Sequence, residues 1–129
     1  MQLKFLSVPV LDQDIALMRY VDILGFKKMA DLPMGDFRWL TVTSPDGIAG
    51  VELVLEPINF PPALVYQKAL FDAGIPALAL ISFDIVTEIH SFKQKSVVFR
   101  GEPRQSGPIK SVLFEDGCGN LINLVQVIQ

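Results

Sequence analysis

The chain has 129 residues and a formal net charge of -3, and 50% of its residues are hydrophobic whereas 19% are charged. This balance predicts one compact domain with a well-filled core and argues against a disordered chain. Lysine and arginine form no cluster, which argues against a nucleic-acid partner, because nucleic-acid binding depends on neutralising phosphates with basic side chains.

The apolar segments are too short for a membrane protein. The longest run, ALALI at 77–81, is far below the ~20 residues that a membrane span needs. The first residues alternate like a strand and carry Lys4, so they predict a first strand and not a signal peptide. We therefore expect a cytoplasmic protein without a membrane partner. The single cysteine, Cys118, excludes an intramolecular disulfide and a cysteine-based metal cage, and is expected to be a structural turn residue.

The first half of the chain predicts one strand, one helix and three further strands. Residues 3–10 alternate as in a strand, and Asp12 or Asp14 can cap the helix that follows and that Gly25 ends. The apolar positions of this helix recur at helical spacing: Ile15, Leu17, Met18, Val21 and Leu24. Further strands are predicted near 26–31, at 37–45 and at 50–57, with the sequence SPDG as the turn between the last two.

The second half repeats this plan. After a connector at about 58–76, with a short helix at 63–73, the pattern predicts a strand at 76–84, a helix at 85–95, a strand at 96–103 and a hairpin at 109–127 whose turn is DGCGN. The polar segment 100–110 is predicted to be an ordinary exposed loop, with a mobile loop near a binding site as the alternative. Duplication is the simplest account, and it predicts a single domain, 1–129, built from module 1 (about 1–57), the connector and module 2 (about 77–129).

Two polar residues, Glu52 and Asn123, occupy equivalent strand positions between aliphatic neighbours. A buried, unpaired carboxylate is costly, so Glu52 must be solvated, paired or functional. We expect both side chains to line a pocket. The alternative is that they form hydrogen bonds with each other, or with water, across a filled barrel.

A resemblance to a known family rests on five stretches in order: DQDIALMRYVDILGF, FRWLTVTSPDG, VELVLEP, YQKALFDAGIPA and VVFRGEP...GPIKSVLFEDGCGNLINLVQ. Together they resemble the glyoxalase/bleomycin-resistance/dioxygenase proteins, the vicinal oxygen chelate superfamily, and above all its small single-domain members. The resemblance spans nearly the whole chain. It implies an α+β fold of two βαβββ modules in one domain, each curling its sheet into a half barrel around a cleft. It also implies a homodimer.

In metal-dependent relatives, the first and last strands of each module supply four metal ligands, and the resemblance places these positions at Phe5, Glu52, Leu78 and Asn123. Only Glu52 is a good ligand, because Phe5 and Leu78 offer no donor atom and Asn123 offers one neutral oxygen. His90 is expected on the surface of the second helix, away from these positions. We therefore expect no metal, no cofactor and no metal-dependent glyoxalase I reaction.

Without a metal, the same positions suit a small organic ligand in an apolar cleft. Trp39 can stack on a planar ligand, although core packing is an equal alternative. Val54 is expected beside Glu52, and Leu80 beside Leu78, because residues two apart share a strand face. The predicted ligand-binding residues are Phe5, Trp39, Glu52, Val54, Leu78, Leu80 and Asn123.

Three functions remain open from the sequence. The first is a binding protein that sequesters a small aromatic or cationic compound, as bleomycin-resistance relatives do. The second is a lyase, isomerase or epimerase in which Glu52, with a pKa raised by an apolar pocket, is the catalytic base. The third is a degenerate module with an interaction role.

Overall fold

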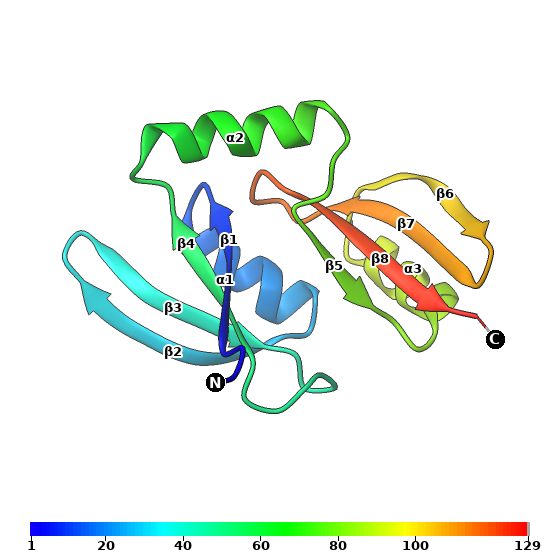
Figure 1. The fold of residues 1–129 in the computed structure, drawn as a ribbon, viewed down its shortest axis with the longest axis horizontal. Helices are drawn as coiled ribbons and strands as arrows, with labels where there is room; N and C mark the ends of the chain where they lie inside the picture. Colours follow the sequence, from blue (N-terminus) through cyan, green and yellow to red (C-terminus); the bar gives the residue numbers. More distant parts are fainter. Residues whose placement is uncertain (129) are drawn as a thin grey trace. The chain divides into compact units, whose positions relative to one another are not determined.

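A computed structural model describes residues 1–128 of the chain (Figure 1). The chain divides into two compact units, Met1–Tyr66 and Gln67–Gln129. The assignment of 1–129 to one functional domain stays a prediction. None of the helices within residues 1–128 is long and apolar enough to cross a membrane.

The first unit has the βαβββ order that the sequence predicted. Its elements are β1 (Phe5–Val10), α1 (Gln13–Met18), a π-helical turn η1 (Arg19–Ile23), β2 (Lys27–Met34), β3 (Phe37–Thr43) and β4 (Glu52–Pro57). The strands form one sheet in the order β1-β4-β3-β2, in which β1 and β4 run parallel and the other pairs run antiparallel. The strand predicted near 26–31 extends to Met34, which lengthens the sheet on its β2 side.

Helix α1 is fixed by its cap and by one glutamine. Asp12 is the N-cap, since its Oδ1 accepts a hydrogen bond from the Ile15 N–H at 2.9 Å. Gln13 donates through Nε2 to the carbonyl oxygens of Arg38 (2.8 Å) and Leu55 (3.0 Å), and its Oε1 accepts from the Arg38 N–H at 3.1 Å. These bonds hold the start of α1 against β3 and β4.

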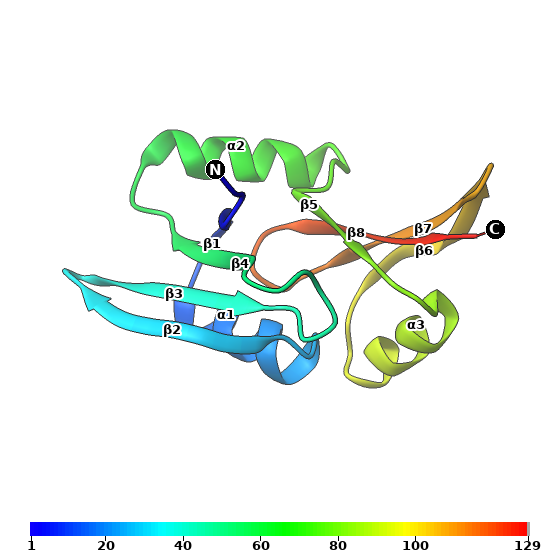
Figure 2. The ribbon, with the colours of Figure 1, turned by 60° about the horizontal axis from the view of Figure 1, so that its bottom comes forward.

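The core of the first unit lies between the helical segment and one face of the sheet. Apolar side chains at alternate strand positions are buried there with two from the helical segment: Val8, Val10, Leu40, Val42, Leu55, Ala16 and Tyr20. Because strand side chains alternate, the residues between them face the opposite side, which we call the open face. Figure 2 shows α1 on one side of the β2–β3 ribbon.

The second unit repeats the same order. Helix α2 (Pro61–Asp72) carries the boundary between the units, and β5 (Leu78–Ile81), α3 (Ile85–Gln94), β6 (Phe99–Ser106), β7 (Ile109–Glu115) and β8 (Leu121–Val127) follow. The sheet order is β5-β8-β7-β6, with β5 and β8 parallel. The α+β fold of two βαβββ modules is therefore confirmed, and each four-stranded sheet is open, not a closed barrel.

The segment 100–110 is mostly strand, not the exposed loop that its polar, glycine- and proline-rich composition predicted. Strand β6 continues to Ser106, and the reversal occurs at Gly107, where φ is +58°. The ladder to β7 is interrupted between Arg100 and Arg104, where the register shifts. The composition that predicted a loop therefore marks a bulge within a strand.

The β7–β8 turn is built around a buried carboxylate. Asp116 Oδ1 accepts hydrogen bonds from the backbone N–H groups of Cys118 (2.7 Å) and Asn120 (3.1 Å), and its Oδ2 accepts one from the Asn120 amide (2.9 Å). Gln67 of α2 donates to the Cys118 carbonyl and to Asn120 Oδ1, each at 3.2 Å. Gly119 has a φ of +98°, which L side chains rarely adopt, and a Cβ atom there would lie 2.8 Å from Gln67 Nε2 and displace it, so this position favours glycine. Cys118 is buried in this turn, as expected of a structural residue.

Replacing Asp116 should therefore weaken the fold. We expect Asp116→Asn to lower the free energy of unfolding by about 1–3 kcal/mol, because the amide leaves buried donors of the turn without their charged acceptor. Urea denaturation at neutral pH measures this. Asp36→Asn, in the exposed β2–β3 turn, is the matched control and should stay within about 0.5 kcal/mol of the unchanged protein. Equal midpoints for the two variants would contradict this role of Asp116.

Candidate functional site

The open face of the first unit collects four of the predicted ligand-binding residues. The register places Phe5 beside Glu52 and pairs Val54 with Thr41, and Trp39 lies two residues before Thr41 on β3. Phe5, Trp39, Glu52 and Val54 therefore share one face, opposite to the face that α1 covers. Strand alternation alone did not assign Trp39 to this face, because the register between β3 and β4 is not visible in the sequence.

The outer part of this face is aromatic and apolar. The rings of Phe5 and Trp39 meet edge to face with centroids 5.3 Å apart, and Phe5 is 46% exposed. Three further side chains on the same face are also exposed, and the sequence analysis missed them: Leu32, Met34 and Phe37. Leu32 and Met34 were missed because β2 was expected to end near residue 31, and Phe37 because the sequence does not show which face of the predicted strand 37–45 it occupies. Exposed apolar side chains that gather on one face are typical of a surface that binds something.

Glu52 lies at the inner edge of this aromatic region and is paired. Its Oε1 accepts a hydrogen bond from the Thr41 hydroxyl at 2.6 Å, and its Oε2 lies 2.9 Å from Lys4 Nζ. The Glu52 side chain is 13% exposed, whereas that of Lys4 is 50% exposed. The sequence analysis recognised Glu52 but not its two partners.

These partners decide the protonation state of Glu52. The hydrogen bond from Thr41, and then that from Lys4, lower the pKa of Glu52 from its ordinary value of 4.5, against the raising effect of burial. The expectation that an apolar pocket raises the pKa of Glu52 is therefore wrong. Glu52 is a carboxylate at neutral pH and a weak general base.

The donor set around Glu52 does not suit a divalent metal. Within residues 1–128, no three His, Cys, Asp or Glu side chains come together in a group that could hold an ion. Phe5, the neighbour of Glu52 on β1, has no donor atom, and the ammonium group of Lys4 already occupies one carboxylate oxygen. A hard cation needs several oxygen or nitrogen donors close together, and the other carboxylate of β4, Glu56, lies four residues further along the same face, too far away to share an ion with Glu52.

In the second unit, the register separates two of the predicted residues from Asn123. Asn123 lies beside Ala79 and Leu113, whereas Leu78 lies beside Ile122 and Leu80 beside Leu124. Leu78 and Leu80 therefore share the face of the buried Ile122 and Leu124, and the placing of Leu78 and Asn123 on one face is wrong by one residue. Ala79, not Leu78, corresponds to Phe5.

Asn123 does line a small groove. The groove has a volume of about 260 Å³, and its lining includes Arg100, Arg104, Ser111 and Leu113 together with Asn123. All of them lie on β6, β7 and β8 of the second unit. Val54 and the aromatic residues belong to the first unit, so the predicted residues fall into two groups, one in each unit.

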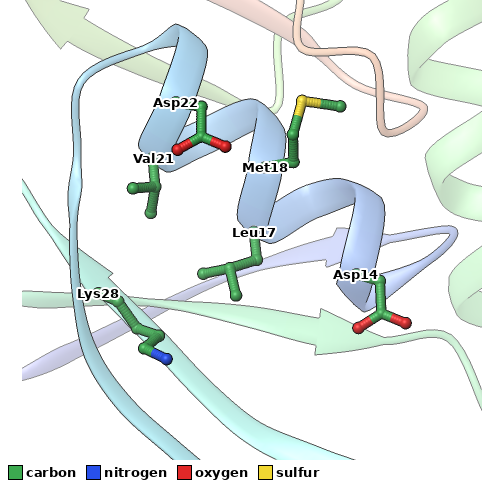
Figure 3. A pocket seen from close by; sticks show the side chains of 6 residues that line it. All are labelled: Asp14, Leu17, Met18, Val21, Asp22 and Lys28. Carbon is green, nitrogen blue, oxygen red and sulfur yellow. The ribbon is translucent and has the colours of Figure 1, made fainter.

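A hollow of about 310 Å³ lies on the opposite side of the first unit's sheet, between the helical segment and β2. Figure 3 shows Leu17 and Val21 of the helical segment above Lys28 of β2, with the carboxylates of Asp14 and Asp22 at either end. Asp14 is paired with Arg38. No residue that the sequence predicted as a ligand contact lies in this hollow.

The Thr41–Glu52 bond can be tested by its effect on acid titration. We expect Thr41→Val to raise the pKa of Glu52 and to lower the free energy of unfolding at pH 7 by about 1–2 kcal/mol, because the carboxylate loses a buried donor. The stabilisation from the lowered pKa of Glu52 is lost as the pH falls from the unfolded value through the folded value. With a higher folded pKa, the variant should lose less stability on acidification, and the loss should be complete at a higher pH. Carboxyl NMR titration and urea denaturation at several pH values measure both effects. An unchanged titration curve for Glu52 would contradict the assignment.

Comparison with known proteins supports the fold. No family model matches the chain. The chain is 46% identical over 126 residues to the uncharacterized protein YurT of Bacillus subtilis (strain 168), a match that covers 98% of this chain and 99% of YurT. It is 33% identical over 127 residues to the uncharacterized protein YetH of the same strain, covering 95% of this chain and 96% of YetH.

Three solved structures share the arrangement. UcmS2 matches with a TM-score of 0.82 and 28% identity over 97% of both chains. TnmS3, an antibiotic binding protein from Streptomyces sp. CB03234, matches with a TM-score of 0.78 and 29% identity over 98% of this chain and 96% of its own. A glyoxalase/bleomycin resistance protein from the same Streptomyces matches with a TM-score of 0.70 and 29% identity over 95% of this chain and 98% of its own. The chain therefore shares a family with YurT and belongs to the glyoxalase/bleomycin resistance/dioxygenase superfamily, as the sequence predicted.

Proposed function

We propose that this protein binds a small, planar organic cation on the open face of its first unit, without a metal. The observation that carries the proposal is the ionised, largely buried Glu52 next to the half-exposed Phe5 and the partly buried Trp39. Aromatic side chains that present their rings beside one polar anchor are the usual components of a small-molecule site. The naming of TnmS3 as an antibiotic binding protein supports the same class of function.

Lys4 indicates which charge the ligand carries. Its Nζ lies 2.9 Å from the Glu52 carboxylate and 5.5 Å from the centroid of the Phe5 ring, so an ammonium group already lies between an anion and an aromatic face. The lysine side chain is half exposed, and such an ion pair contributes little to stability. A ligand cation can therefore displace Lys4 at small cost and take over both of its contacts.

Binding accounts for Glu52 better than catalysis does. A general base at neutral pH works best with a pKa near 7, and the pKa of Glu52 is lowered, not raised. An anchor for a cation requires the opposite property, a carboxylate that stays ionised. We therefore propose the role of Glu52 as a ligand anchor and not as the catalytic base of a lyase or isomerase.

The other predicted features have less support. Val54 lies on the same sheet face as Glu52 but is only 4% exposed, so it offers a ligand little contact surface. Leu78 and Leu80 lack support because they face the side opposite to Asn123. The homodimer rests on the family resemblance alone and stays a prediction.

The proposal is tested with Trp39, which is the only tryptophan of the chain and therefore a specific fluorescent probe of this face. We expect 9-aminoacridine, a planar cation, to quench Trp39 emission saturably and to bind more tightly than acridine, which is neutral at pH 7. Glu52→Gln should weaken the cation about tenfold, equivalent to about 1.4 kcal/mol, and leave acridine unchanged. Lys4→Met should tighten the cation by removing its competitor. Calorimetry gives the affinities independently of fluorescence.

The matched control is Glu56→Gln, in the same strand but exposed and outside the proposed contacts. It makes the same chemical change without removing the anchor, and it should leave the affinity for 9-aminoacridine unchanged. Saturable binding that Glu52→Gln and Glu56→Gln weaken equally would refute the anchor. Failure of both probes to quench Trp39 would refute the site.

Metal binding can be measured separately. We expect protein purified without chelators or a polyhistidine tag to contain no stoichiometric metal, and calorimetric titration with Ni²⁺, Zn²⁺ and Mn²⁺ to give no tight binding, because Glu52 belongs to no cluster of three such donors within residues 1–128. Stoichiometric, tightly held metal that Glu52→Gln releases would instead restore a metal-dependent activity.

A further inference from the structure

The bulge in β6 opens the groove that Asn123 lines. Strand β6 pairs with β7 at Phe99 and Arg100 and resumes pairing only at Arg104, so residues 101–103 leave the ladder. Gly101, with φ at +84°, makes the turn that this departure requires. The groove of about 260 Å³ lies against this bulge.

One charged side chain of the groove, that of Arg100, already forms an ion pair. Arg100 Nε donates to Glu115 Oε2 at 2.8 Å, and its guanidinium group lies 4.9 Å from the centroid of the Phe71 ring of α2. These two contacts hold the side chain of Arg100 from two sides. Arg100 therefore forms a fixed wall and is neutralised by Glu115.

Two other side chains of opposite charge in the same groove form no ion pair. Glu102 and Arg104 both line it, yet within residues 1–128 neither side chain has a hydrogen bond or an ion pair, with the other or with any third residue. Both side chains are exposed, and Glu102 lies in the bulge, outside the ladder that Arg104 rejoins. A free carboxylate and a free guanidinium group thus lie at separate places along one groove.

Uncharged groups complete the lining. The hydroxyl of Ser111 and the amide of Asn123 have no hydrogen-bond partner in the described part of the chain. Their polar atoms are not buried, so a molecule in the groove can reach them. Leu113 lies between them as an apolar wall, since it pairs with Asn123 in the sheet and lies two residues from Ser111 on β7. The groove therefore combines two separated charges, two hydrogen-bonding groups and an apolar surface.

We propose that this groove binds a small zwitterion of the amino-acid type, with its carboxylate on Arg104 and its ammonium group on Glu102. Arg100 is neutralised by Glu115, and the remaining charges of the lining, those of Glu102 and Arg104, sum to zero, so a simple anion or cation would meet repulsion as well as attraction. A zwitterion satisfies both open charges at once, and Asn123 and Ser111 supply further hydrogen bonds to it. This goes beyond the proposed function, because it concerns the second unit and another class of ligand.

The test uses three probes of one shape: L-leucine, 4-methylpentanoate, which lacks the amine, and 3-methylbutan-1-amine, which lacks the carboxylate. Each is titrated into ¹⁵N-labelled full-length protein in the millimolar range, and the backbone amide signals of residues 100–113 and 123 are followed by NMR. We expect saturable shifts there with L-leucine and at least about tenfold weaker binding of the other two probes, because each loses one charge pair.

Variants then assign the two ends of the probe. Arg104→Gln and Glu102→Gln should each weaken L-leucine about tenfold, and Arg104→Gln should leave the affinity for the amine unchanged. Lys27→Gln, an exposed charge removal in the first unit, is the control and should bind as the unchanged protein does. Equal affinities for the three probes, shifts insensitive to both groove variants, or no saturable shifts would each overturn the proposal. Since Trp39 reports the first unit and these amides the second, either site can fail while the other stands.

Discussion

The parallel pairing of the first and last strand in each unit is the constraint on which the rest of the structure depends. In β1–β4 and in β5–β8 it fixes which side chains face the buried side of the sheet and which face its open side. A shift of one residue in either pair would exchange the two faces. In the first unit, the observed register buries Val8 and Leu55 and leaves Phe5 and Glu52 on the open face. The strand register that buries the apolar core residues thus also determines which residues form the proposed ligand surface.

Carboxylates with little access to water illustrate a second constraint, since each must find its partners within its own unit. Asp116 is enclosed by backbone and amide donors of one turn and serves the fold. Glu52 has one buried donor, Thr41, and one half-exposed cation, Lys4, so only part of its coordination is fixed. The part that is not fixed is what a ligand can exchange. This distinction separates a structural carboxylate from a proposed anchor better than burial alone does.

The sequence predicted the order of elements and the duplication, because turn glycines, capping aspartates and apolar periodicity are local signals. It also singled out Glu52, since a carboxylate between aliphatic residues is itself conspicuous. It did not predict Lys4 and Thr41 as partners of Glu52 or the neighbours of Asn123, because these contacts depend on register between strands far apart in the chain. The misplacing of Leu78 by one residue has this cause. The bulge at Gly101 resembled a loop because irregular strand and loop use the same residues.

The two units use one plan for different chemistry. At the strand position where the first unit has Glu52 beside Phe5, the second has Asn123 beside Ala79. Replacing an aromatic neighbour by a methyl group removes a stacking surface, and replacing the carboxylate by an amide removes the charge that would repel the carboxylate of a ligand. Arg104 can then bind the carboxylate of a ligand on that side of the second sheet, whereas an arginine near Glu52 would be neutralised. The change from Glu52 to Asn123 therefore fits the proposed division of labour, in which the first unit selects a planar cation and the second a zwitterion.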